Sequence, residues 1–509
     1  MTVTVGAGSL TIADVDAVAR QGARVALDPA AVDGLERGRA LVERLSQSGE
    51  AVYGVTTGVG KLKDTVIPPE DRRHLQRNLV LSHAGGVGPP LAEAEARAIV
   101  FLLAASLARG HSGARRELVN LVVACLNQGV VPVIPERGSV GASGDLAPLA
   151  HVALVLIGEG EAVVNGERLT GGDALRHAGL APVALEMKEG LALLNGTHLM
   201  AGLGALLVTD AAELARLADV AGAMSLEALM GSHTAFDPRI HALRPHPGQV
   251  ASAANLRALT ADSGIIASHR DCTRVQDAYS LRCMPQVHGA AREAASFARG
   301  IVEREINSVT DNPLLFPDDG IVLSAGNFHG QPLALALDAL AIGLTYLAGI
   351  SERRIDRLVN PLTNEALPAF LAARGGLESG YMIAQYVAAA LVSDCRVLCH
   401  PASADSVPTS GLQEDYNSMG AGAALKARQV LERARQVLAI ELLVASQALH
   451  LRAPLLPGAG SRAALVAVRR RIPPLDADRY LKADLDAALD LCRDGSVLAA
   501  VEGAVGRLG

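Results

Sequence analysis

The longest helical pattern in the chain covers residues 420–450, GAGAALKARQVLERARQVLAIELLVASQALH, where apolar residues recur with a period near 3.6. Similar patterns cover 91–108, 201–222, 381–398 and 478–494. Half of the 509 residues are hydrophobic, yet only 3% are aromatic and Trp is absent. The core must therefore be built from Ala, Leu and Val, which suits closely packed helices. The sequence predicts an all-α, mainly helical chain.

Irregular Gly- and Pro-rich stretches separate the helical segments, at 53–70, 130–148, 307–330 and 400–420. In a helix bundle such loops gather at an end and carry the function. The loop-rich part of the chain gives way to long helices near residue 200. We therefore expect an N-terminal domain at 1–200 and a long-helix region at 201–509. Short strands are expected at 2–5, 162–164 and 322–323, with Asn165-Gly166 closing a hairpin.

Composition argues against several classes of partner. The net charge is −7 with no basic stripe, so no nucleic acid is expected. No two of the six Cys have C-x-x-C spacing, which argues against a zinc site or a disulfide scaffold. Residues 331–350 are nearly long and apolar enough to span a membrane, but Asp338 interrupts them. We therefore expect a helix buried in a bundle and no association with a membrane. No signal peptide is evident at the N-terminus, so we expect a cytoplasmic protein.

The stretch 138–151, GSVGASGDLAPLAH, places four small residues ahead of a lone acid, Asp145. One interpretation is structural: Ser143 or Asp145 caps a helix that begins just after them. A helix cap does not explain why Ala142 and Gly144 flank the serine so tightly.

A chemical interpretation accounts for each residue type. In a compressed loop the amide nitrogen of Gly144 attacks the carbonyl carbon of Ala142 and closes a five-membered ring. Loss of water, including the Ser143 hydroxyl, leaves an exocyclic methylidene. Glycine supplies an unhindered nitrogen and permissive backbone angles, and Asp145 moves protons or holds the turn. The product is an electrophile that needs no added cofactor.

A second dense stretch, DCTRVQDAYSLRCMPQ at 271–286, sets Gln276, Tyr279 and Arg282 at i, i+3 and i+6. On a helix Gln276 and Tyr279 share a face, with Arg282 at its edge. An arginine placed there can hold a carboxylate through two parallel hydrogen bonds. A surface salt-bridge face is an equal alternative.

The chain resembles the aromatic amino acid ammonia-lyases. Ala-Ser-Gly is the signature of that family, whose prosthetic group is 4-methylideneimidazol-5-one (MIO). The motifs YGVTTGVG, NLVLSHAGGVG, LLNGTH, DCTRVQDAYSLRC, NSVTDNPL, GNFHG and QEDYNSM occur in family order over nearly the whole chain. The resemblance is greatest to the histidine-specific members. It implies a long-helix bundle of the aspartase/fumarase-like type, MIO formed from Ala142, Ser143 and Gly144, no metal and no external cofactor.

The resemblance also implies roles for single residues. Tyr53 matches the base that removes the β-proton, which needs its phenol pKa lowered from about 10 by nearby positive potential. Glu414 matches the acid that contacts the substrate imidazole, and Arg282 matches the clamp for its carboxylate. His83 and Phe328 match residues near the substrate ring. Asn195 and Gln276 match residues that hydrogen-bond the MIO group or the substrate. Tyr279 matches a second active-site tyrosine.

The implied activity is elimination of ammonia from L-histidine to give trans-urocanate, in a homotetramer with shared active sites. Some positions depart from the histidine-specific pattern. Tyr416-Asn417 stands where His-Val is usual, and Asn417-Ser418 is more similar to the phenylalanine and tyrosine lyases. Ala278 and His288 stand where Pro and Met are common. A tyrosine or phenylalanine lyase or aminomutase therefore stays open, as does an inactive helical scaffold. His83 and Glu414 favour histidine, because an imidazole needs polar partners.

Overall fold

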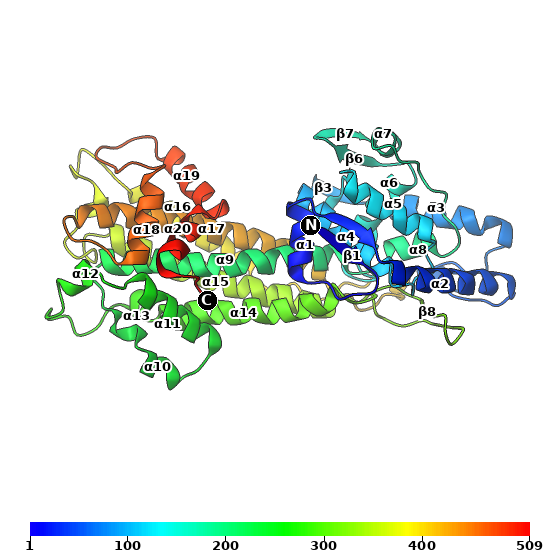
Figure 1. The fold of residues 1–509 in the computed structure, drawn as a ribbon, viewed down its shortest axis with the longest axis horizontal. Coiled ribbons are helices and arrows are strands. Elements are labelled where there is room, and N and C mark those ends of the chain that lie inside the picture. Colours follow the sequence, from blue (N-terminus) through cyan, green and yellow to red (C-terminus); the bar gives the residue numbers. More distant parts are fainter. The chain divides into compact units, whose positions relative to one another are not determined.

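Helices make up most of the chain, which confirms the predicted mainly helical fold class. The computed structural model describes residues 1–509. Each predicted helical segment coincides with one helix: α4 (Glu93–Leu107), α9 (His198–Ala228), α16 (Met382–Leu398), α17 (Gly420–Leu451) and α19 (Leu481–Arg493). Figure 1 colours these helices along the chain.

The chain forms two compact units that are discontinuous in sequence. Unit 1 contains Met1–Thr209, Ala298–Asp338 and Pro401–Leu425, and unit 2 contains Asp210–Phe297, Ala339–His400 and Lys426–Gly509. The division expected from the sequence, 1–200 and 201–509, is continuous and differs from these units. The difference arises because four long helices each contribute residues to both units: α9, α14 (Met284–Glu305), α15 (Gln331–Val359) and α17.

Unit 1 combines helices with small strand pairs. Its helices, besides parts of the long ones, are α1 (Ile12–Arg20), α2 (Pro29–Gln47), α3 (Arg72–His83), α4, α5 (Arg116–Asn127), α6 (Leu146–Leu156), α7 (Gly171–His177) and α8 (Glu189–Leu194). Its strands are β1 (Thr2–Val5), β2 (Arg24–Leu27), β3 (Val87–Pro90), β4 (Val131–Pro132), β5 (Pro135–Arg137), β6 (Glu161–Val164), β7 (Glu167–Thr170), β8 (Leu314–Phe316) and β9 (Ile321–Leu323). Helices α3, α6 and α8 pack on one another and carry loops that form the candidate site.

The predicted hairpin is confirmed. Strands β6 and β7 pair antiparallel, and β4 extends the pair to a three-stranded sheet beside α7 (Figure 1). Asn165 and Gly166 connect β6 to β7 with φ of 51° and 82°. A two-residue hairpin turn requires this positive φ at both positions, which Asn and Gly tolerate best. The remaining pairs are β1–β2, which is parallel, and the antiparallel β3–β5 and β8–β9.

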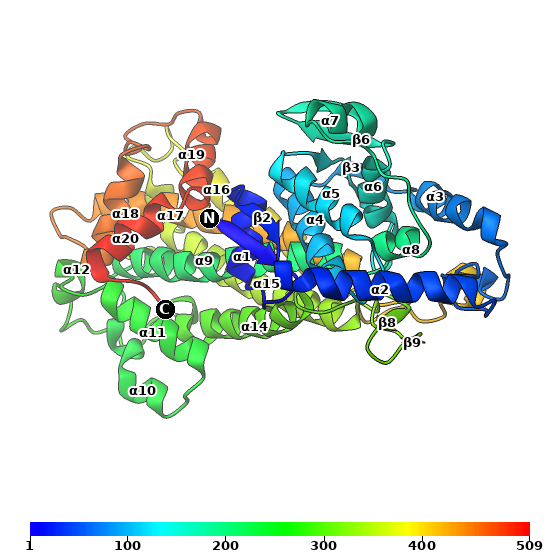
Figure 2. The same cartoon turned by 45° about the vertical axis from the view of Figure 1, so that its right-hand side comes forward.

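Unit 2 is helical. Its elements, besides parts of the long helices, are α10 (Pro238–Ala242), α11 (Pro247–Leu259), α12 (Gly264–Ala267), α13 (Tyr279–Arg282), α16, α18 (Ala459–Arg469), α19 and α20 (Ser496–Val505). Within this unit α9, α15 and α17 lie side by side (Figures 1 and 2).

Two helices, α9 and α15, are long and apolar enough to cross a membrane by length and composition. The apolar windows of α9 and α15 are 78% and 61% buried inside the structure, as in the core helices of a large bundle. Asp338, which interrupts the apolar run of α15, is buried and accepts a hydrogen bond of 2.7 Å from the backbone N–H of Ser403.

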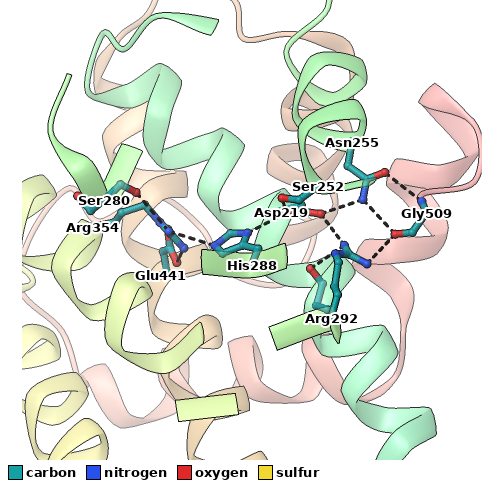
Figure 3. A network of polar contacts seen from close by, with 10 residues as sticks. Asp219, Ser252, Asn255, Ser280, His288, Arg292, Arg354, Glu441 and Gly509 are labelled. Carbon is teal, nitrogen blue, oxygen red and sulfur yellow. Dashed lines mark hydrogen bonds and ion pairs between the residues drawn. The ribbon is translucent and has the colours of Figure 1, made fainter. Parts of the chain in front are cut away.

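A buried charge network occupies the core of unit 2 (Figure 3). Glu441 of α17 accepts two hydrogen bonds from the guanidinium of Arg354, at 2.5 and 2.8 Å, and both side chains are fully buried. Asp219 of α9 accepts from Nδ1 of His288 at 2.8 Å and from Arg292 at 2.6 Å. Burial alone would raise the pKa of Asp219, but Arg292 and these hydrogen bonds lower it to about 2. His288 lies between the two halves, with Nε2 3.4 Å from Nη1 of Arg354.

Candidate active site

The Ala-Ser-Gly loop is held in a conformation that only glycine permits at its end. Gly144 has φ of +75°, and a Cβ added there would lie 2.2 Å from the carbonyl oxygen of Gly196. The two glycines form an isolated parallel bridge, and the N–H of Asp145 donates to Gly196 at 2.8 Å. Ala142 and Gly144 are buried, whereas Ser143 is half-buried. The loop is thus fixed directly after Ser143, which lines the cavity described below.

Helix α6 begins at Leu146 and Asp145 occupies its N-cap position, as the structural interpretation expects, but the Asp145 side chain makes no capping hydrogen bond there. The carboxylate instead accepts from the backbone N–H groups of Leu199 and Met200, at 3.0 and 3.1 Å, in the first turn of α9. The unpaired N–H groups of a helix N-terminus attract a carboxylate in this way. Burial raises the pKa of Asp145 to about 7, although these bonds oppose the shift.

A cavity of about 790 Å³ lies beside the loop within unit 1. The structure brings six of the predicted site residues together in its wall: Tyr53, His83, Ser143, Asn195, Phe328 and Glu414. Leucines complete much of the rest of the wall, among them Leu79 and Leu191. A mostly apolar cavity with a few convergent polar groups is the usual form of a small-molecule site.

Glu414 connects the reactive loop to a turn late in the chain. The Ser143 hydroxyl donates to Oε1 of Glu414 at 3.3 Å, and the Thr409 hydroxyl donates to Oε2 at 2.7 Å. The carboxylate therefore spans two polar groups that lie far apart in sequence. The sequence interpretation assigned Glu414 but missed Thr409, which lies in the same irregular stretch at 400–420.

Tyr53 places its phenol oxygen in the cavity wall, where it accepts a hydrogen bond of 3.1 Å from the N–H of Gly60. Burial and the negative charge of Glu414 raise the phenol pKa, and only the Gly60 bond lowers it. The expectation that positive potential lowers this pKa is therefore wrong for the isolated chain. The Gly-rich motif YGVTTGVG supplies the N–H that opposes the shift.

His83 is the last residue of α3, and one of its ring nitrogens already has hydrogen-bond partners. Nδ1 lies 2.8 Å from the carbonyl oxygen of Leu79 and 3.1 Å from the Ser82 hydroxyl. Because a carbonyl can only accept, Nδ1 carries a proton. In the tautomer that carries its proton on Nδ1, Nε2 is a hydrogen-bond acceptor.

Asn195 follows the last residue of α8 and is buried. Its Nδ2 donates to the carbonyl of Asn312 at 2.8 Å, whereas its Oδ1 has no hydrogen-bond partner. Asn312 is held in turn by the N–H of Ala325, which donates to its Oδ1 at 2.8 Å. Sequence interpretation noted the motif NSVTDNPL without assigning Asn312 a part, and the structure shows that this residue orients Asn195. A buried unpaired acceptor in a cavity wall is suited to a donor from a bound group.

Gln276, Tyr279 and Arg282 lie in unit 2, where Gln276 and Arg282 line a separate cavity of about 600 Å³. Helix α13 contains only Tyr279–Arg282, so the predicted helical face shared by Gln276 and Tyr279 is wrong. Residues 274–278, which include Gln276, have no regular secondary structure. Tyr279 is 71% exposed, and the Arg282 guanidinium lies 4.6 Å from its ring centroid.

Helix α13 is tied to the buried charge network of unit 2. The guanidinium of Arg354 donates to the backbone carbonyl of Ser280 at 3.4 Å (Figure 3). The same guanidinium is held by Glu441. The segment that carries Tyr279 and Arg282 is therefore anchored to the core of its unit. No group of three or more His, Cys, Asp or Glu side chains in the chain is arranged to hold a metal ion.

Comparison with known proteins identifies the family. The family model for aromatic amino acid lyases matches residues 10–470. The chain is 58% identical to a histidine ammonia-lyase of Anaeromyxobacter sp. over 96% of its length and 98% of that protein. It is 56% identical to a histidine ammonia-lyase of Gloeobacter violaceus, over 98% of its length and 97% of the relative's.

Solved structures agree with this match. A tyrosine aminomutase from Streptomyces globisporus superposes with a TM-score of 0.95 at 39% identity, over 100% of both chains. A histidine ammonia-lyase from Trypanosoma cruzi superposes with a TM-score of 0.91 at 44% identity, over 99% of this chain and 96% of that one. The chain belongs to the aromatic amino acid lyase family.

Proposed function

We propose that the chain is a histidine ammonia-lyase, a carbon–nitrogen lyase that eliminates ammonia from L-histidine and releases trans-urocanate. The observation that carries the proposal is the contact of Ser143 with Glu414 in a cavity that also contains His83. An acid and a histidine beside the reactive serine provide polar partners for an imidazole. Eight relatives at 52–58% identity over nearly the whole chain are histidine ammonia-lyases, which supports the same substrate.

Separate incubation with L-histidine, L-tyrosine and L-phenylalanine tests the proposal. We expect trans-urocanate from histidine and little conversion of the other two amino acids. An unsaturated or rearranged product from tyrosine or phenylalanine, without urocanate from histidine, would instead identify a different member of the family. No conversion of any of them would favour an inactive scaffold.

The proposal includes an MIO group formed from Ala142, Ser143 and Gly144. The residues fit such a group: Gly144 occupies a cradle that a Cβ would overfill, and Asn195 presents an unpaired acceptor to the same cavity. Once formed, the group supplies an electrophile without an external cofactor. With seven Tyr and no Trp in the chain, near-ultraviolet absorbance beyond the tyrosine contribution is a direct readout of its formation.

The side chains of the cavity have separate proposed roles in substrate binding and proton transfer. His83 offers Nε2 to a substrate ring N–H, and Glu414 offers Oε1. Tyr53 is the proposed base for the β-proton, and burial, with a smaller contribution from the Glu414 charge, raises the pKa of its phenol. An imidazole bound to Glu414 offsets part of that charge and so removes one cause of the raised pKa.

Replacement of Glu414 is expected to discriminate between substrates. Glu414→Gln and Glu414→Ala should lower histidine turnover about ten- to a hundredfold, because a hydrogen bond to a charged group contributes about 1.5–3 kcal/mol in the transition state. Binding of the carboxylate should change less, since Arg282 is intact. Turnover numbers and Michaelis constants on all three amino acids provide the measurement. Undiminished histidine turnover in Glu414→Ala would remove Glu414 from the mechanism.

We also propose a homotetramer in which different copies share each active site. The support comes from unit 2, where Gln276 and Arg282 line a separate cavity and Tyr279 is exposed. Helix α16 of the same unit exposes Ile383, Tyr386 and Val397, and a large exposed apolar face marks an interface.

Light scattering is expected to give four times the mass of one 52.5 kDa chain. A complementation experiment tests the sharing. Tyr53→Phe and Arg282→Met should each be nearly inactive, and hetero-oligomers formed by co-expressing the two should recover part of the activity. A monomeric mass, or mixed oligomers with no recovered activity, would contradict the proposal.

A further inference from the structure

We propose that Thr409 and Asn417 are positioning residues that orient Glu414 toward an imidazole-bearing substrate through a directed hydrogen-bond relay. The inference rests on the proposed function and deepens it. Its starting point is Asn417, which departs from the histidine-specific pattern and is buried at 1% exposure.

The backbone places Thr409 opposite Glu414. The N–H of Thr409 donates to the carbonyl of Glu414 at 2.8 Å, and the N–H of Glu414 donates back at 3.4 Å. These two residues thus form an isolated antiparallel bridge across the short turn that contains Ser410–Leu412. Their side chains meet as a consequence, with Oγ1 of Thr409 2.7 Å from Oε2 of Glu414.

Asn417 fixes the direction of the Thr409 hydroxyl. Its Nδ2 donates to the carbonyl of Val407 at 2.6 Å and to Oγ1 of Thr409 at 3.1 Å. The Val407 carbonyl can only accept, so this side of the amide must be its nitrogen. Because Asn417 already supplies a hydrogen to the Thr409 oxygen, the hydroxyl proton points to Glu414. A relay that ends in a donor matches an ionised carboxylate, which can only accept.

The relay leaves one carboxylate oxygen for the cavity. Oε2 of Glu414 is committed to Thr409, while Oε1 lies 3.3 Å from the Ser143 hydroxyl. A bound imidazole N–H therefore meets a carboxylate whose orientation and charge are set before binding. Preorganised charge of this kind acts on the transition state more than on initial binding.

The same turn is attached to the Ala-Ser-Gly loop. The Ser418 hydroxyl donates to the carbonyl of Gly141 at 3.1 Å, and the N–H of Met419 donates to the carbonyl of Val140 at 2.8 Å. Residues 417–419 thus fix the position of Glu414 relative to Ser143. A valine at position 417 cannot donate a hydrogen bond to Thr409. The asparagine that replaces it in this chain therefore helps to orient Glu414, the residue proposed to bind the substrate imidazole.

The test compares Thr409→Val, which removes the hydroxyl, with Thr409→Ser, which keeps it at nearly the same place. On L-histidine we expect Thr409→Val to lower kcat about tenfold or more, with a smaller change in KM. Thr409→Ser should restore most of kcat, because it keeps the hydroxyl that donates to Glu414. A structural role alone would not produce this split between kcat and KM.

Asn417→Val provides a second, milder variant. The Thr409 hydroxyl then rotates freely, and we expect a loss in kcat of about threefold, in line with a weak neutral hydrogen bond. This variant carries the test if Thr409→Val fails to fold, as judged by circular dichroism. Parent-like kcat and KM in every folded variant at Thr409 or Asn417 that breaks the relay would overturn it while leaving the proposed function intact. Absence of urocanate from the parent protein would instead overturn both.

Discussion

Ser143→Ala is expected to yield a folded protein with almost no activity. Alanine has no hydroxyl to lose, so the methylidene cannot form, and the loss in kcat should be on the order of 10³-fold or more, as when a covalent catalytic group is removed. Folding should be preserved, because the half-buried Ser143 makes one long hydrogen bond of 3.3 Å to Glu414. Such a bond contributes less than about 1 kcal/mol to the free energy of unfolding. Initial rates on L-histidine and a denaturant titration measure the two effects.

Two observations sharpen this test. The near-ultraviolet absorbance beyond tyrosine should disappear in Ser143→Ala along with the activity. Ser143→Cys is a matched control, because cysteine can also eliminate and should retain part of both signals. Activity of Ser143→Ala close to that of the parent would refute the assignment of the loop as the source of an electrophile.

Long periodic segments made the fold predictable. In α17 and α9 the apolar residues recur with the helical period over many turns, and no other secondary structure buries such a pattern. The short helix α13 was not predictable in the same way. Its four residues follow an irregular segment, 274–278, whereas the spacing of the side chains predicts a helical face that extends back to Gln276, where the structure has no helix. The structure of such a short segment depends on tertiary contacts, and α13 makes one through the bond from Arg354 to the Ser280 carbonyl.

Site residues were predictable from the sequence where the type of side chain by itself indicates the reaction. Ser143 between two small residues indicates an electrophile, and the acid at Glu414 indicates a polar partner. Positioning residues gave a weaker signal. Asn312 and Asn195 are 117 positions apart, so their hydrogen bond becomes visible only in the folded chain.

The departure at His288 has a comparable explanation. Its two ring nitrogens face Asp219 and Arg354, which lie 69 and 66 positions away in sequence (Figure 3). From the sequence alone this histidine is only an unusual residue at a position where methionine is common. In the structure it links two buried charged groups, and this role concerns the stability of unit 2 rather than substrate choice.

Arg354→Met is expected to lower the free energy of unfolding by about 3–5 kcal/mol, the usual cost of leaving a buried charge without its partner. Glu441 would keep only the hydroxyls of Ser225 and Ser351, each at 2.6 Å, to stabilise a fully buried carboxylate. The midpoint of denaturant unfolding should fall accordingly. The loss should extend to α13, because the carbonyl of Ser280 also loses its donor.

A double replacement separates the charge effect from the packing effect. In Arg354→Met with Glu441→Leu no buried charge remains at this pair, and apolar side chains of similar volume fill the space. Replacing a buried ion pair in this way is often neutral or stabilising, so we expect the double variant to recover most of the stability lost in Arg354→Met. Equal destabilisation of the single and double variants would show that the shape of the guanidinium, rather than its charge, holds the helices of unit 2. A double variant that is stable but binds L-histidine weakly would show that the bond to Ser280 is needed to hold Arg282 in place.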